Sequence, residues 1–195
     1  DSGGGIDENL WDRNWIIADD GATKMLLGNS SGDGLGGYGV TDSSTDFDGD
    51  GKADILLSAS HEDYSGAGDA GSISIVLSSS ISELEDSTTI GNADYRIRSN
   101  YSGAHCGRDA AFIDDWSGDG LPDLLIGCPL YDEPSKPDRG RVFLIKSETL
   151  LENEDFITSD FILESHADVF FKGRDNSDRC GTNVGNVGDY DGDGI

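Results

Sequence analysis

The sequence contains no apolar run near the roughly 18–20 residues that a membrane-spanning helix needs, so direct membrane insertion is not expected. Positive charge is also scarce, because 13 Lys and Arg stand against 39 Asp and Glu, for a formal net charge of −26. Nucleic acids and anionic membrane surfaces bind basic patches, so neither is expected as a partner. The opening residues, Asp-Ser-Gly-Gly-Gly, have none of the features of a signal peptide.

Cysteine, proline and glutamate are the other scarce residues. Three cysteines without a CxxC pair are too few for a disulfide scaffold and argue against a cysteine-based zinc or redox site. The chain has 4 Pro but 28 Gly, and 30 Asp but only 9 Glu. Because Asp favours caps, turns and metal loops where Glu favours helix interiors, the composition predicts short strands joined by many turns. A chain of 195 residues with 35% hydrophobic content can bury one sizeable core.

A nine-residue aspartate-rich segment is the most informative feature, because the chain repeats it. It covers residues 46–54 (DFDGDGKAD) and 115–123 (DWSGDGLPD), and it begins again at 189–195 (DYDGDGI), with starts 69 and 74 residues apart. Carboxylates at positions 1, 3, 5 and 9 of such a loop converge on one point, and the carbonyl of position 7 joins them. Glycine at position 6 allows the sharp turn. Hard oxygen ligands in a flexible loop are typical of Ca²⁺, and without a cation the carboxylates would repel each other.

The predicted calcium ligands follow from these positions in each copy. They are Asp46, Asp48, Asp50, the Lys52 carbonyl and Asp54 in the first loop, Asp115, Ser117, Asp119, the Leu121 carbonyl and Asp123 in the second, and Asp189, Asp191, Asp193 and the Ile195 carbonyl in the third. Ser117 is a neutral ligand where Asp48 is charged, so the second loop is expected to bind calcium more weakly. The third loop would need residues beyond Ile195 to close, and we therefore expect a piece of a longer polypeptide.

Strand-like segments accompany each loop at the same spacing. Apolar runs follow the complete loops at 55–60 and 124–129, second runs lie at 72–77 and 141–145, and third runs lie at 95–98 and 161–164, with 24–27 as their upstream counterpart. Segments 40–45, 108–114 and 182–188 precede the loops, which gives four short strands per unit. Segments 82–85 and 149–152 are expected to form one helical turn at most.

Four-stranded sheets repeated at a fixed period are typical of propeller blades. The predicted fold class is therefore all-β, with propeller-type blades, aspartate-rich calcium loops and a partial propeller in this chain. We expect one propeller region over residues 1–195. Within it, 1–35 is a linker and the outer strand of a preceding blade, 36–99 and 100–165 are blades, and 166–195 begins a further blade that stops inside its calcium loop.

The order of motifs resembles the FG-GAP repeat of integrin α-chain propellers and their bacterial relatives. Tyr38-Gly39 stands for the Phe-Gly pair, an aspartate loop and an apolar strand follow, and Gly127-Cys128-Pro129 is similar to Gly-Ala-Pro. The resemblance covers about residues 22–195, although Cys-Gly replaces Phe-Gly in the later units and Ser58-Ala59-Ser60 replaces Gly-Ala-Pro in the first. It implies adhesion or protein–protein contact through loops on one face, with calcium in a structural role.

No catalytic constellation is apparent, so the chain is predicted not to be an enzyme. His61, His105 and His166 lie far apart in the sequence without a shared Ser/Asp pattern. The expected partner is a protein or glycan ligand, or neighbouring copies of the chain in an assembly. Calcium loops suit the millimolar Ca²⁺ outside cells, which favours a secreted or cell-surface location.

Two alternatives to an adhesion module remain open. One is a structural subunit of a surface filament. The other is a carbohydrate-binding propeller, in which Trp11, Trp15 or Trp116 would stack on sugars.

Two further pairs of residues are candidate modification sites. Asn29-Ser30-Ser31 and Asn100-Tyr101-Ser102 are glycosylation sequons at equivalent repeat positions, although either Asn could equally serve only in a turn. Cys106 starts the strand before the second loop and Cys128 ends the strand after it, so an antiparallel hairpin brings them near each other. A disulfide and a pair of separate buried thiols are both compatible with this arrangement.

Overall fold

The computed structural model describes residues 14–19, 22–40, 45–81, 83 and 87–188, which form three β-sheets joined by loops and short helices. The three-stranded sheet contains β1 (Asn14–Asp19), β2 (Ala22–Leu27) and β6 (Ser87–Thr89). The five-stranded sheet has the order β11-β7-β5-β4-β3, with β3 (Leu35–Val40), β4 (Ile55–Ala59), β5 (Ser72–Val76), β7 (Tyr95–Arg98) and β11 (Phe161–Ile162). The four-stranded sheet has the order β12-β10-β9-β8, with β8 (Asp109–Ile113), β9 (Asp123–Cys128), β10 (Arg141–Ile145) and β12 (Val169–Lys172).

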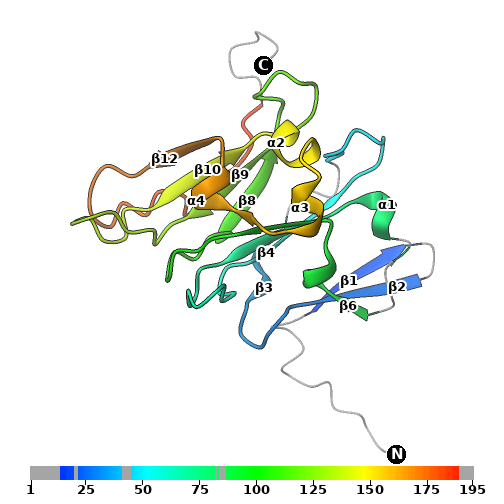
Figure 1. Ribbon diagram of the computed structural model, residues 1–195, viewed down its shortest axis with the longest axis horizontal. Coiled ribbons are helices and arrows are strands. Elements are labelled where there is room, and N and C mark those ends of the chain that lie inside the picture. Colours follow the sequence, from blue (N-terminus) through cyan, green and yellow to red (C-terminus); the bar gives the residue numbers. More distant parts are fainter. Residues whose placement is uncertain (1–13, 20–21, 41–44, 82, 84–86, 189–195) are drawn as a thin grey trace, which may run out of the picture.

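The sheets follow one another across the molecule in chain order, from the β1–β2–β6 sheet at the lower right of Figure 1 to the β8–β9–β10–β12 sheet at the upper left. The helices are single turns: α1 (Ser78–Ile81), the 3₁₀ turn η2 (Ile90–Asn92), α2 (Ser147–Leu151), α3 (Asp155–Thr158) and α4 (Leu163–His166). The prediction of a largely β structure is confirmed for this part of the chain, and the helical turn predicted at 149–152 overlaps α2. Of the other predicted turn, 82–85, residues 82, 84 and 85 lie outside the described residues. None of the described helices has the length and apolar character needed to span a bilayer.

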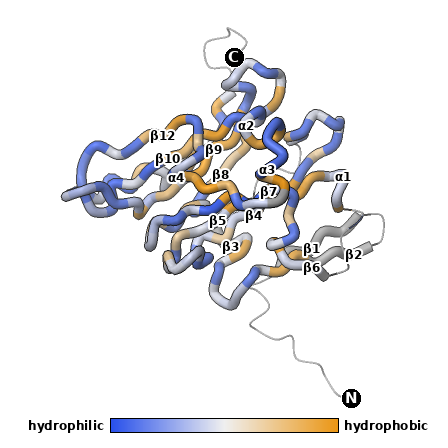
Figure 2. The backbone as a smooth tube through the Cα atoms, in the orientation of Figure 1, coloured by the Kyte–Doolittle hydropathy of each residue, from blue (hydrophilic) through white to orange (hydrophobic). Residues whose placement is uncertain are grey.

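Each of the two described aspartate loops connects two neighbouring antiparallel strands, as predicted. The first loop joins β3 to β4 and the second joins β8 to β9, where Ile113 pairs with Asp123. The third strand of each unit then pairs antiparallel with the second, β5 with β4 and β10 with β9. The hydrophobic strands and the hydrophilic loops that alternate along this path are visible in Figure 2.

The predicted outer strand of the second unit is wrong. Residues 161–164 form only the two-residue strand β11 and the first two residues of α4. The fourth strand of this sheet is β12, which pairs antiparallel with β10. The sheet therefore extends to Lys172, past the boundary expected at residue 165. The segment 161–164 was as apolar as 169–172, so periodicity alone could not separate the two.

A short strand from each unit instead adds to the outer strand of the preceding sheet. β11 pairs in parallel with β7, and β6 pairs in parallel with β2 in the same way. Arg96 and Arg98 of β7 form ion pairs with Asp160, directly before β11, at 3.1 and 3.2 Å. These crossing strands connect each repeat to its predecessor, a feature that the sequence pattern did not predict. The strand β1 was also not predicted.

The five-stranded sheet is buried on both of its faces. One face packs against the four-stranded sheet, where the Phe47 and Phe112 rings stack at 5.1 Å. On the other face Leu57 and Val76 belong to a second cluster with Leu26 of β2. Strands buried on both sides have continuous rather than alternating apolar runs, which explains the pattern ILLSA in β4.

Two expectations concern the end of the chain. The predicted strand at 182–188 does not form, since none of these residues belongs to a strand, and Val187 is 87% exposed. The third aspartate loop, residues 189–195, lies outside the described residues, as do residues 41–44 of the first predicted pre-loop strand.

Gly71 provides a test of how tightly the repeats are packed. It has φ +87°, and a Cβ there would lie 2.1 Å from the carbonyl oxygen of Cys106 in the next unit. Gly66 has nearly the same φ, +89°, with nothing within 4 Å. We expect Gly66→Ala to lower the free energy of unfolding by about 1–2 kcal/mol through backbone strain alone. Gly71→Ala should lower it by at least about 2 kcal/mol more, as measured by urea unfolding; equal losses would contradict the close approach.

Candidate functional site

The first aspartate loop is folded around its own carboxylates. Asp46 accepts hydrogen bonds from the backbone N–H of Gly49 and of Gly51, both at 2.8 Å, and Asp48 accepts one from Asp50 N–H at 3.1 Å. The two glycines have φ of +79° and +88°, the left-handed region that side chains disfavour. Asp46, Asp48 and Asp50 thereby form a group whose ligand atoms all lie within 4.8 Å of one another, which could hold a metal ion.

The predicted ligand at position 9, Asp54, has a different position. It is 1% exposed, and its two carboxylate oxygens accept hydrogen bonds from Phe47 N–H at 2.7 Å and Ser78 N–H at 2.8 Å. It is not part of the three-carboxylate group. Asp54 therefore connects the beginning of the loop to Ser78, just after β5. This structural role does not depend on a bound cation.

The second loop repeats this arrangement. Asp115 accepts hydrogen bonds from Gly118, Asp119 and Gly120 N–H at 2.6–2.9 Å. Asp123, fully buried, accepts hydrogen bonds from Ser117 N–H at 2.7 Å and Ser147 N–H at 2.9 Å.

A serine hydroxyl at the start of the following helix completes each loop. Ser78 Oγ donates to Asp50 Oδ2 at 3.0 Å, and Ser147 Oγ donates to Asp119 Oδ2 at 2.7 Å. The two loops thus share this serine contact and have different side chains at position 3. The sequence pattern did not indicate that these serines belong to the site, although both follow an apolar strand at the same spacing.

The electrostatics of the two loops differ. Burial raises the pKa of Asp48, and the charges of Asp50 and Asp46 raise it further, against the hydrogen bond from Asp50 N–H. For Asp119, burial also acts upward, but hydrogen bonds from Ser147 and Leu121 outweigh it and lower the pKa. The first loop has one more carboxylate, so the repulsion among its negative charges is larger. A cation among these oxygens would relieve that repulsion.

The oxygen-only donor set suits a hard dication such as Ca²⁺. The structure brings together Asp46, Asp48 and Asp50 of the first predicted ligand set.

A second group that could hold a metal was missed by the sequence interpretation. His61, Asp69 and His105 have ligand atoms within 4.8 Å of one another, and the two imidazole centroids lie 4.6 Å apart. Burial lowers the pKa of His105, and the neighbouring His61 lowers it further. His61 and His105 are 44 residues apart in sequence, so only the packing of one repeat on the next brings them together.

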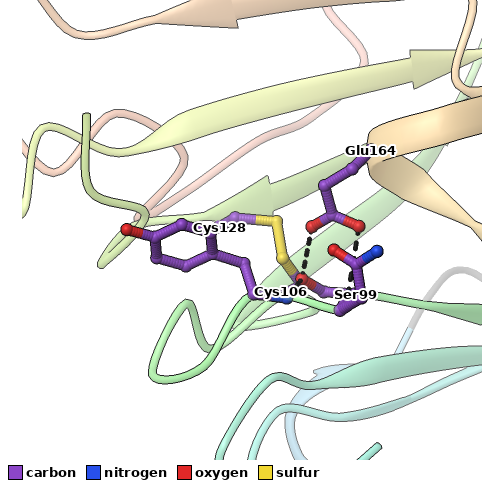
Figure 3. Close-up of a disulfide and its surroundings, with 6 residues drawn as sticks. Ser99, Cys106, Cys128 and Glu164 are labelled. Carbon is purple, nitrogen blue, oxygen red and sulfur yellow. Dashed lines mark hydrogen bonds between the residues drawn. A yellow bond between two sulfur atoms is a disulfide. The ribbon is translucent and has the colours of Figure 1, made fainter. Parts of the chain in front are cut away.

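The candidate modification sites are now placed. Cys106 and Cys128 form a disulfide with an S–S distance of 2.03 Å, buried beside the carboxylate of Glu164, which accepts a hydrogen bond from Ser99 Oγ at 2.6 Å (Figure 3). Cys180 is a free thiol, and burial raises its pKa.

The two sequons differ in their surroundings. The side-chain amide of Asn29 donates a hydrogen bond to Glu62 at 2.7 Å, so its nitrogen is engaged within the fold. Asn100 is exposed, and its backbone N–H donates to Glu164. Trp116 is 48% exposed, Trp11 lies outside the described residues, and the side chain of Trp15 is not described.

Paired substitutions separate the two kinds of aspartate. In chelator, Asp54→Ala should lower the free energy of unfolding by about 2–4 kcal/mol, because two charge-assisted hydrogen bonds are lost and two buried N–H groups are left unsatisfied. Asp48→Ala should leave it unchanged or raise it slightly in chelator, because a like-charge repulsion is removed. In millimolar Ca²⁺, Asp48→Ala should instead be destabilising relative to the original chain. Denaturant unfolding with and without calcium measures all four values, and equal behaviour of the two variants would contradict this division of roles.

Residues 38–76 match the family described as FG-GAP repeat. The matched segment runs from the Tyr38-Gly39 pair through the whole first aspartate loop to the end of β5. It agrees with the resemblance inferred from the motif order, and residues 38–76 are thus similar to an FG-GAP repeat.

Proposed function

We propose that this chain is part of an extracellular, calcium-stabilised β-propeller that serves in adhesion or protein–protein interaction, and that it is not an enzyme. The two antiparallel sheets with an aspartate loop between their first and second strands are then successive blades. The calcium ions hold the loops in shape and take no part in chemistry.

The observation that supports this proposal most strongly is the position of the first aspartate loop inside the FG-GAP match. Its three clustered carboxylates lie within residues 38–76, and the loop at 115–123 has the same hydrogen bonds. FG-GAP repeats are similar to those of integrin propellers, which supports both a role in protein contact and a location outside the cell. An acidic, oxygen-only site of moderate affinity suits millimolar extracellular Ca²⁺.

Calorimetric titration of the chelator-treated chain with Ca²⁺ tests the proposal. We expect one ion in each complete loop, with the first loop binding more tightly because it has three clustered carboxylates where the second has Ser117 at position 3. The difference should be about tenfold in Kd, or about 1.4 kcal/mol. Calcium should also raise the melting temperature, since a ligand that binds only the folded state stabilises it.

The two loops supply their own matched controls. Asp48→Ser should bring the affinity of the first loop close to that of the second, and Ser117→Asp should bring the second close to the first. Absence of calcium uptake, or an affinity of the first loop that does not respond to Asp48→Ser, would contradict the calcium assignment.

Contact with neighbouring copies is a second candidate, favoured by exposed aromatic side chains on β12. Phe170 and Phe171 are 50% and 51% exposed on the outer strand of the four-stranded sheet, which has no strand on its other side among the described residues. An open edge with apolar side chains favours association with another strand or sheet. Such an edge is expected in a filament subunit, or in a blade that pairs with a neighbouring blade.

Sedimentation velocity of the 195-residue chain tests this second candidate. We expect concentration-dependent association that Phe171→Lys reduces, because a charge at the open edge disfavours pairing. Ile157→Lys, at another exposed apolar position on α3 (56% exposed), is the control and should leave the association unchanged. A monomer at all concentrations would argue against assembly through β12.

A further inference from the structure

We propose that His61, Asp69 and His105 form a binding site for a transition-metal dication of the Zn²⁺ type, separate from the calcium loops. The three side chains come from two repeats. His61 follows β4 and Asp69 precedes β5 in the first, whereas His105 lies in the connection from β7 to β8. Imidazole nitrogens and a carboxylate oxygen are donors that Zn²⁺ takes readily and Ca²⁺ does not.

The spacing of the donors fits such an ion. Their ligand atoms already lie within 4.8 Å of one another, and tetrahedral coordination at about 2.0–2.2 Å needs donor atoms roughly 3.3–3.5 Å apart. Small rotations of side chains on a fixed backbone close that difference. Two histidines and one carboxylate leave a fourth position for water or for an oxygen of a bound partner.

The backbone that carries the site is firmly held. Gly103, His105 and Cys106 donate N–H groups to the carbonyls of Gly68, Asp69 and Ala70 at 2.8–3.1 Å. Cys106 is also in the disulfide, directly after His105. A site on a rigid frame loses little conformational entropy when an ion binds.

One atom at the site lacks a partner. Nδ1 of His105 is buried and makes no hydrogen bond, and buried polar atoms of this kind usually have one. A cation bound by the two imidazoles would explain why these side chains lie together, which ring packing alone does not.

The equivalent position in the next repeat has the same backbone contacts with different side chains. Asp138 and Arg179 occupy the positions of Asp69 and His105, and Arg179 N–H donates to the Asp138 carbonyl at 3.0 Å, as His105 does to Asp69 at 3.1 Å. All four residues have φ between +48° and +52°. This backbone conformation is therefore a feature of the repeat and not a strain specific to the first junction.

The side chains at the two junctions differ in charge. Arg179 places a fixed positive charge 3.9 Å from the Asp138 carboxylate. The residue equivalent to His61 is Leu130. The first junction replaces that ion pair with two imidazoles beside Asp69, and a bound dication would supply the missing positive charge.

An ion could reach the site from solvent. A pocket of about 400 Å³ is lined by His61 and Asp69 together with Asp33, Glu62 and Asp63. These carboxylates give the pocket a negative field that concentrates dications.

The test is titration of the chelator-treated chain with Zn²⁺ in saturating Ca²⁺, by calorimetry and by melting temperature. A Cys180→Ser background removes the free thiol as a competing ligand. We expect one Zn²⁺ per chain and a higher melting temperature. Asp69→Asn and His105→Asn should each weaken binding at least tenfold, since Asn tolerates the left-handed backbone at both positions and removes a metal donor.

A third variant guards against loss of fold. His105→Arg copies the side chain of the next junction, so the chain should keep its unfolding midpoint in chelator while losing Zn²⁺ uptake. His166→Gln changes a histidine outside the cluster and should leave uptake unchanged. Should the original chain take up no Zn²⁺ in saturating Ca²⁺, or should binding persist in both Asn variants and in His105→Arg, the site is only a packed pair of imidazoles.

Discussion

One buried carboxylate in each of the two described repeats determines how the aspartate loop and the neighbouring strands are arranged. Asp54 and Asp123 are the last residues of the two described aspartate loops and are at most 1% exposed. A charge removed from water is tolerated only where hydrogen bonds replace the lost hydration. Each carboxylate therefore takes one N–H from the loop and one from Ser78 or Ser147, 24 residues later. This requirement holds the loop, the second strand and the end of the third strand in one arrangement.

The clustered carboxylates are a consequence of that arrangement. With the loop closed at its far end by Asp54, the side chains of Asp46, Asp48 and Asp50 share one side of a tight turn. Their mutual repulsion would favour an open loop, yet the hydrogen bonds to backbone N–H groups and to Ser78 Oγ hold the turn closed. A preformed ring of oxygens does not have to be assembled when a cation arrives, so less of the binding free energy is lost to ordering.

Much of this could be predicted from the sequence because it is local. The loops, the strands β4, β5, β9 and β10, and the proximity of the two cysteines all follow from short-range patterns of Gly, Asp and apolar residues. The parallel pairing of β11 with β7 could not be predicted, because Phe161 and Ile162 look like any apolar strand and their partner is 64 residues earlier. The role of Asp54 as a structural tie was hidden for the same kind of reason, since Ser78 reaches it only when β4 pairs with β5.

The histidine pair could not be predicted from the sequence either. Sequence inspection treats His61 and His105 as isolated residues, and only the stacking of one sheet on the next brings their rings to 4.6 Å. The comparison of the two junctions shows why such positions vary. The backbone contacts recur with the same φ values at Asp69 and Asp138, so the fold constrains the main chain there and leaves the side chains available for change.

The alternation of strands also separates the two kinds of candidate site. The aspartate loops precede β4 and β9, whereas His61 and Asp69 lie beyond the other end of β4. Five residues of strand span roughly 17 Å, about twice the Debye length of about 8 Å at physiological ionic strength. Direct electrostatic coupling between the two ends is therefore strongly screened. A ligand bound at one end influences the other end mainly by making the shared strands harder to unfold. The ligand at one end of the repeat can therefore change without altering binding at the other end.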